Sequence, residues 1–167
     1  DIWFTGQYPH AIAANSNYVF VGHPSNSISV LDHRLNQRST ESISSNYLSY
    51  AWGMSINSTG NRLAIADYNK NQVVEFSISG TSLSYTQRTS SSYSSSNGYY
   101  RRPTDTGYDS SGNIYALDLY NHRIQKKNSS LAYQTKTGSY STSSGFRYPY
   151  GMQIDSSDNI YVTDFYN

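Results

Sequence analysis

The sequence predicts an all-β protein built from four units of one repeated design, and two observations carry this prediction. A short phrase that runs from Asp or Asn through Ser and Asn into an apolar segment occurs four times, at 15–22, 57–67, 109–118 and 155–164. The phrase ends at Gly22, Asp67, Asp118 and Asp164, so successive units are 45, 51 and 46 residues apart. No segment of useful length shows helical periodicity. A repeat of this length is typical of solenoids and propellers.

The first predicted strand of each unit is an alternating segment, found at 9–14, 51–56, 103–108 and 149–154. Its third position is Ala11, Gly53, Asp105 or Gly151. Small residues at this place predict that the backbone passes close to a crowded axis. A turn rich in Asp, Asn, Ser and Gly follows each segment and favours a hairpin.

Two further strands follow in most units. Four consecutive apolar residues predict a strand that is covered on both faces, at 18–21, 63–66, 114–117 and 160–163. A third strand is predicted at 28–31, 73–76 and 124–127. It begins six residues after the end of the repeated phrase in all three cases, which indicates a turn of fixed geometry.

A polar, alternating fourth segment completes the unit. Residues 83–89 match residues 131–137 almost position for position, and this pattern is typical of an outer edge strand. Four antiparallel strands, buried in the middle and polar outside, describe a propeller blade. We therefore predict one β-propeller domain with blades near 8–47, 48–98, 99–145 and 146–167 and an N-terminal strand at 1–7. The Ser-rich stretch 90–96 is expected to be a mobile insertion, which accounts for the longer spacing of 51 residues between the second and third units.

The third unit carries the residues of a known repeat. Asn121, His122, Arg123 and Ile124 follow directly on the strand that ends in Asp118. This resembles the NHL repeat, whose consensus leads from Pro-x-Gly through Asp-x-x-Gly-Asn-Ile-Tyr-Val-x-Asp to Asn-His-Arg-Ile. Units one and two are looser, with Asn26 and Asn71 at the His122 position. The resemblance implies a β-propeller, commonly of six blades, in a family of RNA- and protein-binding modules, extracellular sensor domains and the lyase half of peptide amidation.

The fourth unit has its first two strands but not the third and fourth. The N-terminal strand can fill one of these two places, because propellers often close by pairing the N-terminal strand into the last blade. We therefore expect that these residues belong to a longer chain or associate with other copies to complete the sheet. Disorder after Asn167 is the alternative.

Composition narrows the class of partner. Charged residues make up 14% of the 167 residues and the net charge is +1, so no strong field draws nucleic acid or an anionic membrane. The 18 tyrosines give a surface suited to sugars, water and neighbouring chains. The absence of cysteine excludes disulfides and thiolate chemistry. No apolar run is long enough for a membrane span.

The sequence predicts no catalytic residue, metal or cofactor. A metal site needs three or more converging ligands, whereas the four histidines are dispersed at His10, His23, His33 and His122. The amidating-lyase activity depends on a metal site of this kind, so the dispersed histidines disfavour that activity as well. Asp67, Asp118 and Asp164, with Gly22 in the first unit, recur once per blade, which indicates that they shape the following turn.

A basic and aromatic patch is the candidate contact surface. Arg101 and Arg147 each lie two residues before the proline that opens a blade, so they are expected on one face of the propeller. Their aromatic neighbours are Tyr99, Tyr100, Phe146 and Tyr148. Arg and Tyr are common interface anchors, and the same pair suits single-stranded RNA. Blades one and two have Gln7 and Ser49 at this place, which favours a general contact surface over RNA.

Two N-glycosylation sequons begin at Asn57 and Asn128, a number that chance alone would give, and both fall in predicted turns. The Ser-rich loops at 90–96 and 139–144 could carry O-linked sugar. The sequence thus predicts a non-enzymatic extracellular propeller that acts as a scaffold or adhesion module, glycosylated and self-assembling or part of a longer repeat chain, with protein as its partner. A cytoplasmic protein- or RNA-binding module is the alternative, and an amidating lyase ranks last.

Overall fold

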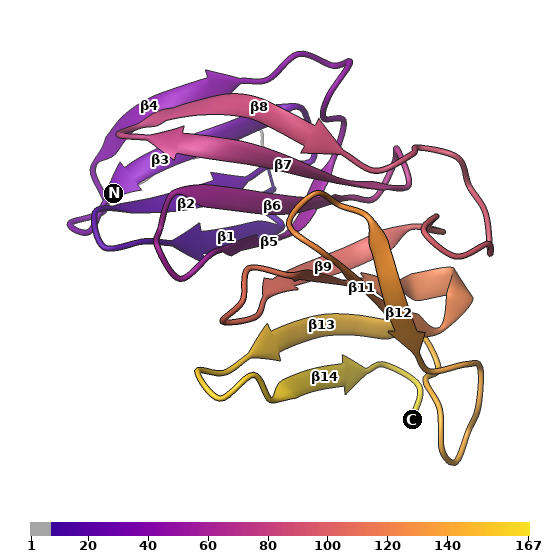
Figure 1. The fold of residues 1–167 in the computed structure, drawn as a ribbon. Helices are drawn as coiled ribbons and strands as arrows, with labels where there is room; N and C mark the ends of the chain where they lie inside the picture. Colours follow the sequence, from indigo (N-terminus) through magenta and orange to yellow (C-terminus); the bar gives the residue numbers. More distant parts are fainter. Residues whose placement is uncertain (1–7) are drawn as a thin grey trace.

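The computed structural model describes residues 8–167, and these form β-sheets joined by turns (Figure 1). Three sheets have four antiparallel strands and one has two, each in simple chain order. Blade one contains β1 (Ala11–Ala14), β2 (Tyr18–Gly22), β3 (Ser27–Asp32) and β4 (Gln37–Ser42). Blade two contains β5 (Ala51–Ile56), β6 (Arg62–Asp67), β7 (Gln72–Ser79) and β8 (Ser82–Arg88). The predicted all-β blades are confirmed.

Blade three contains β9 (Pro103–Tyr108), β10 (Ile114–Asp118), β11 (Arg123–Lys127) and β12 (Tyr133–Thr137), with a 3-10 turn at Leu119–Asn121. Blade four contains β13 (Pro149–Ile154) and β14 (Ile160–Asp164). The predicted strand at 1–7 lies outside the described residues. In the part of the chain that the structure describes, no helix is long and apolar enough to cross a membrane.

The blades stack in chain order around a common line. The first strand of each blade contacts the first strand of the next, in the series β1, β5, β9 and β13. The last strands, β4, β8 and β12, lie at the outer edge of their sheets. Figure 1 shows β13 and β14 on the far side of β9 from blades one and two. The first strands therefore form the inner wall of a partial ring.

Apolar residues of each second strand are shared between the two neighbouring blades. In β6, Leu63 and Ile65 pack towards blade one, whereas Ala64 packs with Val73 towards blade three. Side chains of a strand point alternately to the two faces of its sheet. A strand that packs against a blade on each face therefore needs an apolar residue at every position, which explains the unbroken apolar runs. Between blades three and four the core contains Leu117, Ile124 and Met152, with Tyr115, Phe146, Ile160 and Val162 packed against it.

The repeated phrase forms the turn between the first two strands of a blade. Asp155 Oδ1 accepts the backbone N–H groups of Ser157 and Asn159, both at 2.9 Å. Asp109 and Asn57 accept equivalent bonds in blades three and two. The fourth position adopts a positive φ of 74° at Gly60, 78° at Gly112 and 63° at Asp158, which explains its preference for Gly. This turn accounts for the first half of the phrase.

The Ser-rich insertion is held by blade three and does not hang free as expected. The Arg123 guanidinium donates to the carbonyl oxygens of Ser95 and Ser96, both at 3.0 Å. Gly98 is bound twice, by Gln125 Oε1 at its N–H and by Lys127 Nζ at its carbonyl oxygen, both at 2.8 Å. Arg123, Gln125 and Lys127 alternate along β11, so their side chains share one face of it. The insertion is therefore a covering segment with fixed contacts.

Candidate functional site

The inner strands line an open groove of about 700 Å³. A Cβ on Gly53 would lie 2.3 Å from the Thr104 carbonyl oxygen and 2.5 Å from Asp105 Oδ1. The expectation of a close backbone approach at this third position therefore applies directly at β5. Glycine is required there because β9 passes too near for any side chain.

Asp105 fills the same position in β9, and it ties two blades together. Its Oδ2 accepts the Met152 N–H at 2.8 Å and its Oδ1 accepts the Thr106 N–H at 2.9 Å. Burial raises the pKa of Asp105 from 3.8 to about 6, although these two backbone bonds act in the opposite direction. Since both oxygens are engaged by backbone donors, the carboxyl group links β9 to β13 and is not positioned as a free acid or base.

In blades two and four a β-bulge turns one aromatic side chain out of the regular pattern. In blade two the pairing of β5 with β6 shifts between Ala51 and Gly53, and in blade four the pairing of β13 with β14 shifts between Pro149 and Gly151. The skipped residues are Trp52 and Tyr150. A bulge re-aims the side chain of the extra residue, and both of these residues line the groove.

We call the cluster around Trp52 the aromatic mouth, defined by His10, Tyr50, Trp52, Tyr68 and Tyr150. The Trp52 ring stacks on His10 at 4.8 Å, on Tyr50 at 5.2 Å and on Tyr68 at 4.5 Å between centroids, with interplanar angles of 25–27°. Tyr150 meets Trp52 edge-on at 5.9 Å. His10, Trp52 and Tyr150 are the second residues of the inner segments, and this recurrence is the sequence signal that our reasoning missed.

The polar groups of the aromatic mouth are the tyrosine hydroxyls and the His10 ring. Tyr50 Oη and His10 Nε2 share a hydrogen bond of 2.8 Å. Burial raises the pKa values of Tyr50 and Tyr68 above their ordinary value, so both stay hydroxyls. Arg102 is the neighbouring cation: its guanidinium lies 4.7 Å from the Tyr68 ring centroid and donates to Asn69 Oδ1 at 2.8 Å.

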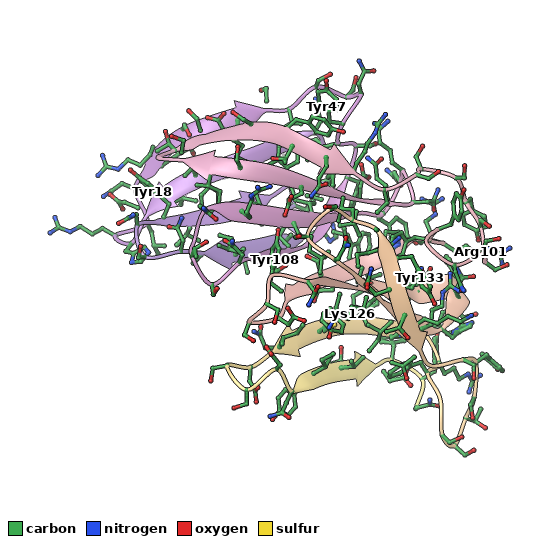
Figure 2. All side chains as sticks on the ribbon, in the orientation of Figure 1. Tyr18, Tyr47, Arg101, Tyr108, Lys126 and Tyr133 are labelled. Carbon is green, nitrogen blue, oxygen red and sulfur yellow. The ribbon has the colours of Figure 1, made fainter. Side chains whose placement is uncertain are left out.

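The structure changes the membership of the predicted basic and aromatic patch. Arg101 and Arg147 do occupy equivalent places, with guanidinium carbons 5.0 Å from the Tyr93 ring and 5.4 Å from the Tyr166 ring. Figure 2 places Arg101 at one extremity of the molecule and Tyr18 at the opposite one. Tyr100 is fully buried and therefore does not belong to any surface.

The other predicted members of the patch have mainly structural contacts. Phe146 packs against the core between blades three and four, and Tyr99 accepts an Arg123 bond at its carbonyl oxygen. Tyr148 contacts the Tyr166 ring at 5.4 Å. Sequence reasoning did not include Tyr93 or Tyr166, because both lie far along the chain from the arginines they cover.

The aspartates that end the second strands fix the approach to the first strand. Asp67 accepts the N–H groups of Ser49 at 2.8 Å and Tyr50 at 3.1 Å. Asp118 and Asp164 accept the equivalent N–H groups of Arg101 and Arg147 at 2.7 Å and 2.8 Å. The expected contact with the following turn is also present, since Asp67 accepts the Lys70 N–H at 3.2 Å and Asp118 accepts the Asn121 amide at 2.8 Å. The donors that the prediction did not include precede the aspartates by 17 or 18 positions.

Gly22 differs from the three aspartates in its role. A Cβ at Gly22 would lie 2.8 Å from the Ala51 Cβ and 3.1 Å from the Ala11 Cβ. The expectation that Gly22 shapes a turn is therefore incomplete: it makes room where blade two packs on blade one.

His122 holds neighbouring blades together through its neutral ring. It has a φ of 52°, and its Nδ1 accepts the Tyr148 N–H at 3.2 Å. Asn71 has a φ of 54° and its Oδ1 accepts the Arg102 N–H at 3.1 Å. Burial lowers the pKa of His122, with the carboxylates of Asp164 and Asp118 acting in the opposite direction. Among residues 8–167, no three His, Cys, Asp or Glu side chains gather as a metal site would require.

The two sequons lie in turns, as predicted. The Asn57 amide donates to Thr59 Oγ1 and Asn61 Oδ1, both at 2.9 Å, so this amide is already engaged in its turn. Asn128 accepts the N–H groups of Ser130 and Ala132 at 3.0 Å each. Glycosylation at either residue stays a prediction.

Comparison with known proteins identifies the repeat. Residues 100–126, which run from the start of blade three into β11, match the NHL repeat. The third blade is an NHL repeat. No curated protein matches the chain.

The solved structures that match include a β-propeller domain and two lyases. Virginiamycin B lyase from Staphylococcus aureus, as a catalytically inactive variant with quinupristin, aligns at a TM-score of 0.67 and 14% identity, over 98% of this chain and 51% of its own. A streptogramin B lyase aligns at a TM-score of 0.64 and 17% identity, over 93% of this chain and 48% of its own. The β-propeller domain of Cps50 (Swd1) from Myceliophteria thermophila aligns at a TM-score of 0.61 and 11% identity, over 87% of this chain and 44% of its own. At these identities the likeness shows the fold alone, and the chain spans about half the length of these structures.

Proposed function

We propose that this chain is a non-enzymatic binding module, a scaffold that holds protein partners at the end of the blades where the inner strands begin. The observation that carries this proposal is the pair Arg101 and Arg147. Each guanidinium lies over a tyrosine ring, and neither forms an ion pair or hydrogen bond with any residue in 8–167. Arginine and tyrosine carry much of the binding energy at protein interfaces.

The charge at this end favours an acidic partner. Asp67 and Asp118 are fully buried and accept backbone N–H groups, so they present no charge to a ligand. The Nε atoms of Arg101 and Arg147 are buried, so the terminal guanidinium nitrogens are the donors left for carboxylate or phosphate oxygens. An acidic protein segment supplies such oxygens, together with apolar side chains for the exposed rings of Tyr93 and Tyr166.

The test uses two polymers as probes. Fluorescence anisotropy of the full chain is measured with a labelled glutamate–tyrosine copolymer and with labelled poly(U), at low and moderate salt. We expect the copolymer to bind, and the variant Arg101→Ala/Arg147→Ala to weaken binding about tenfold. The charge-matched variant Arg38→Ala/Arg62→Ala is the control. Binding of poly(U) alone would replace protein by RNA as the partner, and binding of neither probe overturns the proposal.

Self-association is a second candidate, favoured by the form of blade four. Within the described region β14 pairs with β13 alone, and the Tyr161 ring on it is 59% exposed. Two chains together also have about the length of one matching propeller. We propose that a strand of a second copy adds to the free edge of β14. Sedimentation equilibrium should show a dimer that Val162→Pro abolishes, and a monomer at all concentrations would refute it.

An extracellular location and attached glycans belong to the same proposal. They are supported by the two turn-borne sequons and the uncharged, Ser- and Tyr-rich surface. Intact-mass measurement of protein from its native source tests the glycans, since unmodified Asn57 and Asn128 would remove that part of the proposal.

A further inference from the structure

We infer that the aromatic mouth is a binding subsite for a neutral sugar, with the groove behind it receiving further sugar units. This site is separate from the arginine pair of the proposed function. It is built from the inner strands and depends on Trp52 and Tyr150, whereas the arginine pair lies before the inner strands and depends on Tyr93 and Tyr166.

The rings form a stacked cluster with Trp52 at its centre. The Trp52 plane lies at 25–27° to the planes of His10, Tyr50 and Tyr68, whereas Tyr50 is tilted by 51° to both His10 and Tyr68. Tyr150 stands at 78° to Trp52, is 44% exposed and lies 6.1 Å from the ring of Phe165, itself 67% exposed. A pyranose ring has an apolar face of C–H groups that stacks on a flat aromatic surface, and its edge carries hydroxyls. Exposed rings beside a groove mark a place where a ligand covers apolar area.

The polar atoms of the site match sugar hydroxyls, which both donate and accept. The Tyr50 hydroxyl and His10 ring at the mouth can do the same. Ser55, Thr106 and Gln153 also line the groove. Gln153 is exposed, whereas Thr106 is buried with its hydroxyl 2.9 Å from that of Ser55. A groove of about 700 Å³ is within the range of small-ligand sites.

Charge disfavours the main alternative, a quaternary ammonium ligand. Such cations bind in aromatic cages whose rings surround the charge. Here His10, Tyr50 and Tyr68 stack on Trp52, and the Arg102 guanidinium already lies over Tyr68. The Asp105 carboxylate in the groove is engaged by two backbone N–H groups and does not offer a free counter-charge. A neutral ligand therefore fits this site better than a cation.

The test is isothermal titration calorimetry of the full chain with hexasaccharides of glucose, N-acetylglucosamine, mannose and xylose. We expect at least one to bind with a dissociation constant between about 10 µM and 1 mM. Trp52→Ala and Tyr150→Ala should each weaken that binding about tenfold, a loss comparable to that of one stacked ring. Tyr161→Ala removes a tyrosine that does not line the groove and is 59% exposed, against 44% for Tyr150, and serves as the matched control.

Circular dichroism of each variant must show an unchanged β spectrum, and Trp52→Phe provides a milder change if Trp52→Ala fails to fold. Titration with tetramethylammonium tests the alternative ligand. No binding of any hexasaccharide at about 10 mM, binding that Tyr150→Ala and Trp52→Phe leave unchanged, or binding of tetramethylammonium in place of sugar would each overturn the inference. None of these outcomes depends on Arg101 or Arg147, so the proposed function is tested separately.

Discussion

Replacement of Arg123 should produce a large loss of stability, because this buried side chain links three parts of blade three. Its Nε donates to Asp118 Oδ2 at 2.8 Å, and the ion pair is almost completely buried. Its two terminal nitrogens donate to carbonyl oxygens of Ser95, Ser96 and Tyr99 at 3.0–3.1 Å. Removal of one partner from a buried ion pair typically costs about 3–5 kcal/mol.

The structure places Arg123→Ala near the lower end of that range. The carbonyl groups of Ser95 and Ser96 belong to exposed residues and can bind water instead. Asp118 is fully buried and cannot, but it keeps the Arg101 N–H at 2.7 Å. Burial already raises the pKa of Asp118 above its ordinary value, so loss of the guanidinium favours its protonation at a further cost. We expect a loss of about 3 kcal/mol in the free energy of unfolding.

The assay is urea unfolding at pH 7, followed by circular dichroism and tryptophan fluorescence. Arg123→Met retains most of the side-chain volume, and its comparison with Arg123→Ala separates charge from packing. Arg38→Ala, at a residue whose side chain is 53% exposed in its pair with Asp32, is expected to cost less than about 1 kcal/mol. If Arg123→Ala and Arg123→Met cost no more than Arg38→Ala, the buried network does not hold the insertion, and the reasoning is wrong.

Three further predictions concern the contacts between blades. Burial lowers the pKa of His122, so the contribution of this residue to stability is complete above pH 6.5 and is lost as the pH falls through the folded pKa. His122→Asn keeps a hydrogen-bond acceptor for the Tyr148 N–H and should remove this loss of stability in thermal melts. A pH profile of the variant equal to that of the parent would contradict the prediction. Burial raises the pKa of Asp105 from 3.8 to about 6, so stability should decline as the pH rises from 4 to 6, and melts of Asp105→Asn should lack that decline. Gly53→Ala forces a Cβ within 2.3 Å of a β9 carbonyl oxygen and should lower the free energy of unfolding in urea by about 2 kcal/mol or more. Gly80→Ala is the comparison: no atom lies within 4 Å of its Cβ, so the positive φ of 60° alone should cost about 1 kcal/mol.

The strands and blades could be predicted because they depend on patterns local to the chain. The apolar run at 63–66 and the turn at Asn57 each contain the information for their own conformation. The insertion at 90–96 could not be read in this way. Its Ser-rich composition is typical of a mobile loop, yet the groups that fix it lie on β11, with Arg123 as the principal donor. Tyr100 is buried in the core between blades two and three, where it packs with Ala64 and Val73, residues that are likewise distant in the sequence.

The sequence predicts the positions of the two arginines but not the direction of the Trp52 ring. The positions of Arg101 and Arg147 follow from counting residues to a proline, and equivalent positions in successive blades must share a face. The direction of Trp52 depends instead on a bulge, because an ordinary strand would have placed its ring against a neighbouring blade. No composition signal marks that bulge.

The closing aspartate and the bulge are two parts of one device. Asp67 holds the N–H groups of Ser49 and Tyr50, and the register of β5 against β6 then shifts between Ala51 and Gly53. The same sequence of contacts occurs in blade four, where Asp164 holds the Arg147 N–H ahead of a shift that skips Tyr150. In these two blades the carboxylate fixes the backbone ahead of the bulge, and the skipped residue, Trp52 or Tyr150, faces the groove. The other two blades differ: blade one ends its second strand in Gly22 and pairs β1 with β2 in regular register, and blade three has the buried Thr104 at the second position. Closing aspartate and bulge together therefore account for Trp52 and Tyr150, whereas His10 reaches the groove from a blade that has neither.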